Sequence, residues 1–154
     1  MGHRYGAEVL DTTPFAWWSH AWGPDDETVI GAKIGEAAGQ ARWEAYALLI
    51  CFIVWGPLLL TARGKVAVVG DAEGVLHAYM RFKADCPKVN EIMMELAVRI
   101  APTGRDTCTF HLFSEKNSDA DALSRLAAGA SLPTRVEGVA RTSVVLGSWL
   151  FLRP

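Results

Sequence analysis

The stretch Gln40-Ala-Arg-Trp-Glu-Ala-Tyr-Ala-Leu-Leu-Ile-Cys-Phe-Ile-Val-Trp55 carries the clearest structural pattern in the chain. Its apolar residues recur at helical spacing, so that Trp43, Ala47 and Ile50 fall on one face of a helix. Other apolar residues lie between them and extend the apolar surface nearly all the way round. The sequence therefore predicts a helix from Gln40 to Trp55 that is buried on most sides, as in a two-layer α/β domain.

The same region contains an uncharged run from Ala45 to Ala62, which also satisfies the length criterion for a membrane span. That run has about 18 residues, which just reaches the threshold. Gly56 and Pro57 interrupt it after three helical turns, and the part before them is too short to cross a bilayer. A core helix is therefore the favoured interpretation, and a small membrane protein built on this run is the alternative.

Downstream of this helix the sequence alternates between strand and helix signals. Lys65–Val69 is a compact β-branched run without alternation, which predicts a central strand covered on both faces. Thr107–Phe113 alternates apolar and polar residues and predicts another strand. Helices are expected at Ala72–Phe82, from Pro87 to Ile100, and from Asn117 or Ser118 to Leu126. The side-chain oxygen of Asn117 or Ser118 is expected to cap the last of them.

Upstream, the chain is expected to be extended. Strands are predicted at Glu8–Leu10, Phe15–Trp22 and Thr28–Ile34, with a turn at Gly23–Asp26. Taken together, the element order predicts an α/β fold with a mixed five-stranded sheet flanked by helices. That sheet would consist of a three-strand antiparallel meander followed by parallel strands.

Composition narrows the class of protein. The chain has 154 residues, 51% of them hydrophobic and 21% charged, which is typical of one globular domain. The net charge of −2 gives no support to whole-domain attraction of nucleic acid. Three cysteines without CxxC spacing predict reduced thiols and an intracellular protein, cytoplasmic or nuclear, and a zinc site built from them with His77 or His111 is not favoured. No secretory signal is visible at the N-terminus.

Three segments carry a family resemblance. Gly39-Gln-Ala-Arg-Trp-Glu-Ala-Tyr-Ala-Leu-Leu49 resembles the first helix of the ribonuclease H-like domains attached to retroelement (retrotransposon) reverse transcriptases. Val68-Val-Gly-Asp-Ala-Glu-Gly-Val-Leu76 resembles the strand of that family that ends in an aspartate. His111-Leu-Phe-Ser-Glu-Lys-Asn117 and Ala120-Asp-Ala-Leu-Ser-Arg125 are similar to its closing signature, the most specific motif of the chain. The resemblance covers roughly residues 8–127, within a domain expected at 1–127, and residues 128–154 are expected to form a peripheral tail.

This resemblance implies a ribonuclease H-like fold and a nuclease that cleaves the RNA strand of RNA–DNA hybrids. The residues that match the metal ligands of the family are Asp11, Glu44, Asp71 and Asp121. Two magnesium (or manganese) ions are the implied cofactors, and carboxylates are the hard oxygen ligands that such ions prefer. The implied partners are an RNA–DNA hybrid and a reverse transcriptase polymerase domain, with no membrane.

Each proposed ligand also has a simpler structural explanation. Asp11 precedes Thr-Thr-Pro and suits a turn, Asp71 could cap a helix, and Glu44 and Asp121 sit in first helical turns, where carboxylates favour the helix dipole. Among the other polar residues, His111 is expected to be structural, Asp119 to be a neighbour of the ligand rather than a ligand, and Glu91 and Glu95 to be solvated. Core packing is the default expectation for Trp17, Trp18, Trp22 and Trp43, with base stacking as the alternative.

The sequence also departs from the family pattern. Ala16 and Ser114 stand where the family has glycine, and no polymerase portion is present in these 154 residues. These departures leave an alternative open, in which the domain is catalytically degenerate and acts as a nucleic-acid-binding or structural remnant.

Overall fold

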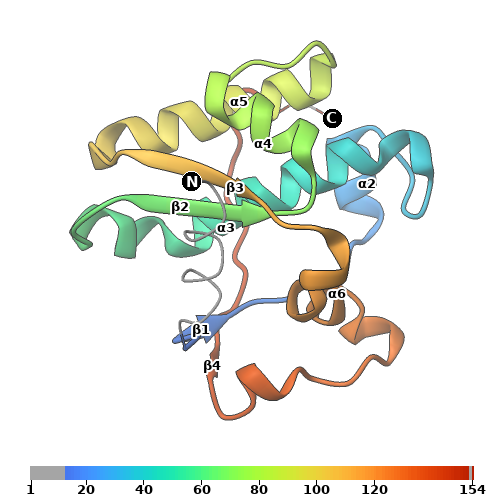
Figure 1. Cartoon of the computed structure of the whole chain (residues 1–154). Coiled ribbons are helices and arrows are strands. Elements are labelled where there is room, and N and C mark those ends of the chain that lie inside the picture. The colour runs from blue at the N-terminus through green and yellow to red at the C-terminus, as the bar shows by residue number, and fades with distance from the viewer. Residues whose placement is uncertain (1–12, 153) are drawn as a thin grey trace.

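The computed structural model describes residues 13–152 and Pro154, and Figure 1 shows their arrangement. The helices are α2 (Pro24–Ile30), α3 (Gln40–Thr61), α4 (Glu73–Arg81), α5 (Pro87–Ile100) and α6 (Ser118–Ser124). The strands are β1 (Ala16–Trp17), β2 (Val66–Gly70), β3 (Thr107–His111) and β4 (Ala140–Arg141). Short 3-10 turns lie at Ala37–Gly39, Ala101–Thr103, Ser114–Lys116, Leu126–Ala128 and Thr134–Val136.

The strands form two separate parallel pairs. β2 pairs with β3 from Val66 opposite Thr107 to Gly70 opposite His111. β1 pairs with β4, and this second pair lies away from the first, at the bottom of Figure 1. The predicted mixed five-stranded sheet with its antiparallel meander is therefore wrong for the described residues, and so is the ribonuclease H-like strand arrangement. Likewise β2 is not a central strand, since β3 is its one strand neighbour among the described residues, and it is not covered on both faces, since Ala67 is exposed.

The predicted meander is wrong because Pro24–Ile30 forms a helix, α2, where the sequence predicts a turn and a strand. Pro24 occupies the first helical turn, where its missing N–H is not needed, and three acidic residues follow it close to the positive end of the helix dipole. Asp26 Oδ2 accepts a hydrogen bond from the backbone N–H of Gly23 at 2.9 Å. Gly31 ends α2 with φ of 64°, the left-handed conformation that glycine adopts without strain. Gly23–Asp26, the residues predicted to form a turn, therefore form the N-terminus of a helix. The predicted strand at Phe15–Trp22 shrinks to β1, and the one at Glu8–Leu10 lies outside the described residues.

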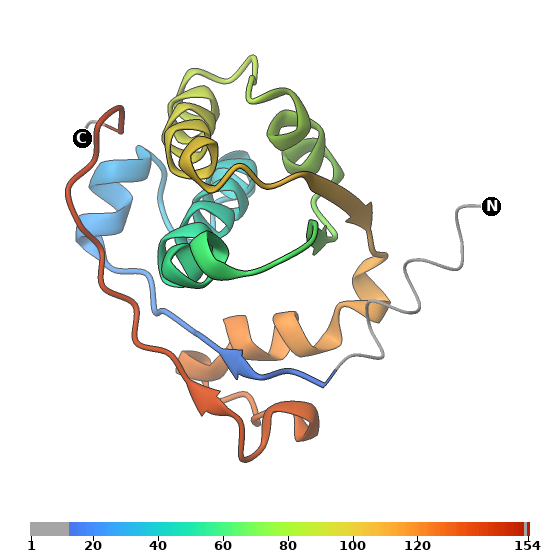
Figure 2. The same cartoon turned by 90° about the vertical axis from the view of Figure 1, so that its left-hand side faces the viewer.

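Helix α3 is the centre of the fold. It packs against α2, α4 and α5, and Figure 2 shows it in the middle of these helices, with α6 on the opposite side. Its fully buried residues include Ala45, Leu49 and Ile50, so one part of α3 lies in the core, but the helix is not buried on most sides as predicted. The core that surrounds them is completed by side chains of the neighbouring helices, chiefly Ile30, Val75, Tyr79, Val89, Ile92, Met93 and Leu96.

The predicted end of this helix at Trp55 is wrong, because α3 continues through Pro57 to Thr61. Ala37–Thr61 is a helical stretch of 25 residues that is long and apolar enough to cross a membrane, with 28% of its most apolar window buried. The core helix of a soluble protein meets the same criterion of length and composition. The buried side chains of α3 all precede Ile53, and beyond Pro57 the exposed Leu58 and Leu60 face outward.

The other predicted elements between residues 65 and 126 are confirmed within two residues at their ends. α4, α5, β2 and β3 lie where the sequence places them, and α6 begins at Ser118 as expected. One detail is wrong: Asn117 is the N-cap residue of α6, yet no side-chain hydrogen bond caps this helix.

The C-terminal segment runs from β4 along the molecule to α5 (Figure 2). Leu152, close to its end, is buried in the core. Glu95 on α5 holds this end, since its Oε1 accepts hydrogen bonds from the backbone N–H groups of Phe151 and Leu152. The expectation of a solvated Glu95 is therefore wrong, because its side chain is fully buried. Glu91 is half-buried and forms an ion pair with Lys88 at 2.8 Å.

Candidate functional site

The predicted site residues lie around the end of the sheet to which β2 and β3 both point. Gly70 is paired in register with His111, and the backbone N–H of Leu112 donates to the carbonyl of Gly70 at 2.8 Å. Asp71 follows directly on β2, with an exposed side chain. Because parallel strands end on the same edge, Asp71 and the residues that follow β3 leave the sheet together.

Asp121 stands in the first turn of α6, shortly after β3. Its backbone N–H donates to the carbonyl of Asn117 at 3.0 Å, an ordinary helical bond. Its carboxylate forms an ion pair with Arg125, one turn later, at 3.0 Å between Oδ1 and Nη2. Both side chains are more than half exposed, so this pair contributes little to stability.

Glu44 lies near the start of helix α3, which runs in the direction opposite to β2. Helix α3 runs back alongside β2 (Figure 1), so that its first turns lie toward the end where β2 finishes. The half-buried Glu44 accepts a hydrogen bond from Gln40 Nε2 at 3.0 Å, again an interaction within one helix.

These carboxylates are not assembled into a metal site. Among the described residues, no three His, Cys, Asp or Glu side chains lie close enough together to hold one metal ion. The oxygen donors of Glu44, Asp71 and Asp121 suit Mg²⁺ or Mn²⁺ chemically, but they do not gather around one point. The fourth predicted ligand, Asp11, lies outside the described residues.

Other polar residues of the closing motif take surface positions. His111 is exposed at the end of β3, with its ring edge-on to Phe113 at 5.2 Å between centroids. Asp119 forms an ion pair with Arg135 at 3.2 Å, which ties α6 to the following loop.

The aromatic residues of the first third are divided between two settings. Trp22 and Trp43 pack on Tyr46 in a core cluster, with ring centroids 5.3 and 6.5 Å from that tyrosine. Trp17 is different, because its ring lies 5.3 Å from the guanidinium of Arg141 in a cation–π contact near the surface.

A buried polar network centred on Asp26 was not predicted from the sequence. His20 Nε2 lies 3.2 Å from Asp26 Oδ2, and the Tyr46 hydroxyl donates to Asp26 Oδ1 at the same distance. With the Gly23 N–H, three groups from two parts of the chain converge on one carboxylate that is 8% exposed. The only available signal was the Pro24-Asp25-Asp26 helix start, which places Asp26 where it can accept from the backbone before it.

We expect the titration of Tyr46 to lower the free energy of unfolding at alkaline pH. Burial, the negative charge of Asp26 and the hydrogen bond to it together raise the pKa of the Tyr46 phenol well above its ordinary value of about 10. The neutral phenol is thus favoured in the folded state. As pH rises above about 10 the unfolded chain loses this proton and the folded chain keeps it, so unfolding becomes easier by up to about 1.4 kcal/mol per pH unit.

Urea unfolding of the parent and of Tyr46→Phe at several pH values between neutral and strongly alkaline tests this effect. The variant should be less stable than the parent near neutral pH and should show a shallower alkaline loss. Burial also raises the pKa of Tyr79, so part of the slope should persist in the variant. Identical alkaline slopes in the two proteins would show that Tyr46 does not titrate as described.

The cysteines should differ in reactivity. Burial raises the pKa of the Cys51 thiol to about 11. The pKa of Cys86 is lowered, chiefly by the backbone N–H of Val89 at the start of α5, with a contribution from Arg42. Cys86 is therefore expected to react with iodoacetamide at pH 8 at least about tenfold faster than Cys51. Peptide mapping by mass spectrometry over time measures both rates, and equal rates would contradict the assignment.

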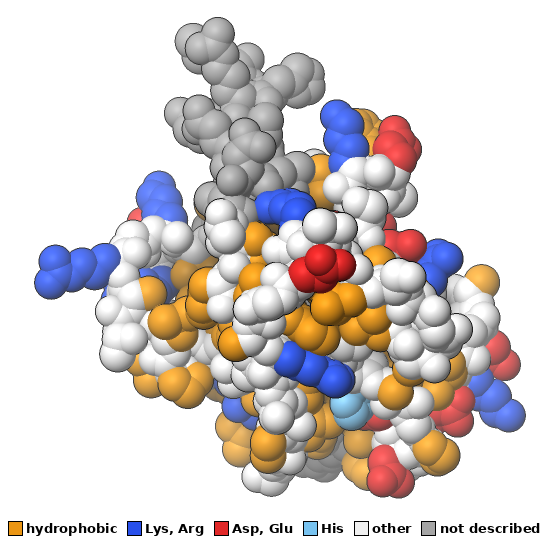
Figure 3. Space-filling view, turned by 90° about the horizontal axis from the view of Figure 1, so that it is seen from below, with side chains coloured by type: hydrophobic (Ala, Val, Ile, Leu, Met, Phe, Trp, Pro, Cys, Tyr) orange, Lys and Arg blue, Asp and Glu red, His pale blue; other side chains and the backbone are white. Residues whose placement is uncertain are grey.

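Charge is mixed on the face seen in Figure 3. Lys, Arg, Asp and Glu side chains are scattered there among hydrophobic ones, without a band of one sign. This agrees with the net charge of −2 and means that contacts to an anionic partner on this face would be local.

Comparison with known proteins adds no family assignment. No protein-family model, curated protein or solved structure matches the chain. The resemblance to retroelement ribonuclease H domains is therefore carried by the sequence motifs around Glu44, Asp71 and Asp121 alone.

Proposed function

We propose that this chain is a divalent-metal-dependent nuclease that cleaves the RNA strand of RNA–DNA hybrids, as part of, or derived from, a retroelement reverse transcriptase. The observation that carries the proposal is the parallel register of β2 and β3. Gly70 lies opposite His111, so Asp71 and the segment leading to Asp121 emerge from one edge. The start of α3, with Glu44, lies toward the same end of the sheet (Figure 1).

The proposed roles follow from the chemistry of these side chains. Glu44, Asp71 and Asp121, together with Asp11, would supply carboxylate oxygens to magnesium or manganese. When bound, such ions supply a more acidic water and stabilise charge on the leaving oxygen. The sheet edge would keep Asp71 in place, because its strand is bonded to β3 up to the preceding residue. Asp121 would first have to exchange its ion pair with Arg125 for the metal.

The test is cleavage of an RNA–DNA hybrid labelled on one strand or the other, with Mg²⁺, with Mn²⁺ and with EDTA. Cutting of the RNA strand only, dependent on either metal, is the expected result. Single-stranded RNA and double-stranded DNA of the same sequence serve as control substrates. A well-folded protein that cuts no hybrid under either metal would contradict the proposed activity.

A second candidate is a domain that has lost catalysis and binds nucleic acid or serves a structural role. It is favoured by one observation: the Asp121 carboxylate forms an ion pair with Arg125. Among the described residues, Asp121 belongs to no group of three side chains that could hold a metal ion. The two candidates differ in metal binding, because an ion that binds the folded state alone raises the thermal unfolding midpoint. The nuclease predicts a rise with Mg²⁺, and the degenerate domain predicts none.

A further inference from the structure

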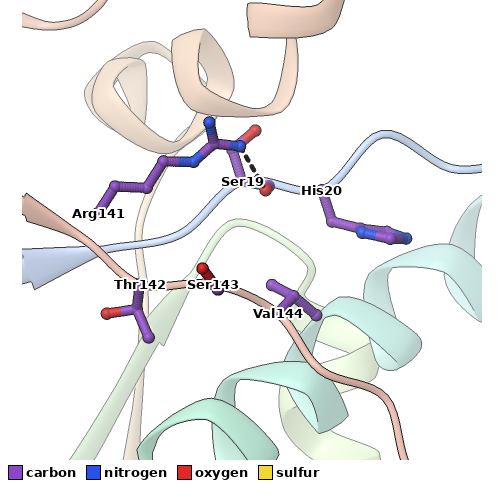
Figure 4. Close-up of a pocket in the computed structure, with 6 residues that line it drawn as sticks. All are labelled: Ser19, His20, Arg141, Thr142, Ser143 and Val144. Atoms are coloured by element: carbon purple, nitrogen blue, oxygen red, sulfur yellow. Dashed lines mark hydrogen bonds between the residues drawn. The ribbon is translucent and has the colours of Figure 1, made fainter.

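A cavity opens where the β1–β4 pair ends. The last bond of this ladder runs from the backbone N–H of Thr142 to the carbonyl of Trp17 at 2.7 Å. Beyond it the two chain segments separate around a cavity of about 380 Å³ (Figure 4). Its lining residues are Ser19, His20, Arg141, Thr142, Ser143 and Val144. The volume is in the lower part of the roughly 300–1,000 Å³ range of small-molecule pockets.

Arg141 is held in a fixed position at this cavity. Its Nη2 donates to the carbonyl of Ser19 at 3.2 Å, and its guanidinium lies 5.3 Å from the centre of the Trp17 ring. The Trp17 ring is itself fixed, because its Nε1 donates to the carbonyl of Val139 at 3.0 Å. A guanidinium carries five N–H donors, and the exposed side chain leaves further donors available to a ligand.

The remaining lining is neutral or polar and contains no carboxylate. In Figure 4 Arg141 and Ser19 lie on one side of the cavity, and the Ser143 hydroxyl faces them from the other side, whereas the Thr142 side chain points away from Arg141. The His20 ring points away from Arg141 in this view, and its Nε2 contacts Asp26. The charge of Asp26 therefore faces His20, Tyr46 and the Gly23 N–H, and Arg141 is the cation of the cavity.

We propose that this cavity binds a phosphate group, held by the guanidinium of Arg141 and the hydroxyl group of Ser143. The planar fork of a guanidinium matches two phosphate oxygens at once, and hydrogen bonds between two charged groups are the stronger kind. Because cation–π contact and a backbone bond already orient Arg141, little side-chain freedom is lost when the ligand binds.

The cavity is joined to the candidate site through Ser19. The Ser19 hydroxyl donates to the carbonyl of Leu123 in α6 at 2.9 Å, and α6 carries Asp121. A phosphate in the cavity would therefore lie beside α6. Two sources share this chemistry: a backbone phosphate of a nucleic acid, which rests on the proposed function, and a small phosphomonoester, which does not.

The test measures binding by the full chain of inorganic phosphate, and separately of a short RNA–DNA hybrid in EDTA, so that no cleavage is needed. Arg141→Gln is expected to weaken phosphate binding about tenfold or more, the loss of one charge-assisted contact. Arg63→Gln, which removes the same charge from an exposed position between α3 and β2, is the matched control and should bind as the parent does. Ser143→Glu leaves the Arg141–Trp17 contact in place and should abolish binding by repulsion.

The salt dependence of hybrid binding distinguishes a nucleic-acid backbone phosphate from a free phosphomonoester. If the cavity holds a backbone phosphate, Arg141→Gln should reduce the salt dependence of hybrid binding by about one unit in the log–log slope, with no change for Arg63→Gln. Phosphate binding that depends on Arg141 without this change assigns the site to a free phosphomonoester. The proposal is overturned if the parent does not bind phosphate, or if Arg141→Gln and Arg63→Gln weaken phosphate binding equally. Either result counts whether or not the protein cleaves hybrids.

Discussion

Replacing Glu95 with alanine is expected to lower the free energy of unfolding by about 2–4 kcal/mol, because a buried acceptor and charge partner is removed. Glu95 is fully buried, and its Oε1 accepts the backbone N–H groups of both Phe151 and Leu152. Its second oxygen, Oε2, lies 3.7 Å from Arg99 Nη2. In the alanine variant the two backbone groups would lose their acceptor, and the C-terminal segment would lose its attachment to α5.

Urea unfolding gives the size of this effect, and hydrogen exchange of residues 144–152 gives its location. Glu91→Ala is the matched control, one helical turn earlier on α5, where the carboxylate is 34% exposed and pairs with Lys88. This control should change stability by less than about 1 kcal/mol. Glu95→Gln keeps one acceptor oxygen, so its loss in the free energy of unfolding should lie between the losses of Glu91→Ala and Glu95→Ala. A loss in Glu91→Ala as large as in Glu95→Ala would show that burial of Glu95 does not matter.

This same pair of glutamates shows what helical periodicity can and cannot predict. Val89, Ile92 and Leu96 at helical spacing correctly placed α5 and its buried face. Glu91 and Glu95, four residues apart, look equivalent on that helix. They differ because backbone N–H groups 56 and 57 residues later in the chain meet only one of them. No local pattern encodes that distant contact.

The elements between residues 65 and 126 were predictable because their signals are local. β2 follows from a β-branched run, and α5 from a proline at its start and a periodic apolar face. The prediction for the first third of the chain was wrong because the same residues permit two structures. Gly23-Pro24-Asp25-Asp26 suits a turn and also a helix N-terminus. The choice between them depends on burial of Asp26 against Tyr46, which the sequence order does not show.

Long-range pairing was the other source of error. β1 and β4 have two residues each, and the Trp17 Nε1 bond to Val139 spans 122 positions. Strands this short carry no detectable alternation, so neither their pairing nor the cavity beside them was predictable. For the candidate site, the sequence placed Asp71 at a strand end and Asp121 in a first helical turn, and both placements are confirmed. It could not tell whether their carboxylates come together.

Asp71→Asn is expected to reduce metal-dependent cleavage of an RNA–DNA hybrid by a factor on the order of 100 or more. Substitution of groups that merely orient metal ligands already costs about 10–100-fold, and a ligand itself should cost at least as much. Asparagine has the shape of aspartate but lacks its charge. Because Asp71 is exposed at the end of β2, the free energy of unfolding without metal should change by no more than about 0.5 kcal/mol.

Two controls separate the loss of a ligand from a general loss of negative charge. Asp85→Asn removes a carboxylate from an exposed position between α4 and α5 and should leave the cleavage rate unchanged. Asp119→Asn breaks the ion pair with Arg135, two positions from Asp121, and should change the rate far less than Asp121→Asn. If the parent cleaves hybrids and Asp71→Asn cuts them as fast as Asp85→Asn does, then Asp71 is no ligand. If instead Asp71→Asn and Asp121→Asn both abolish cleavage and the two control variants do not, the edge shared by β2 and β3 is the catalytic edge.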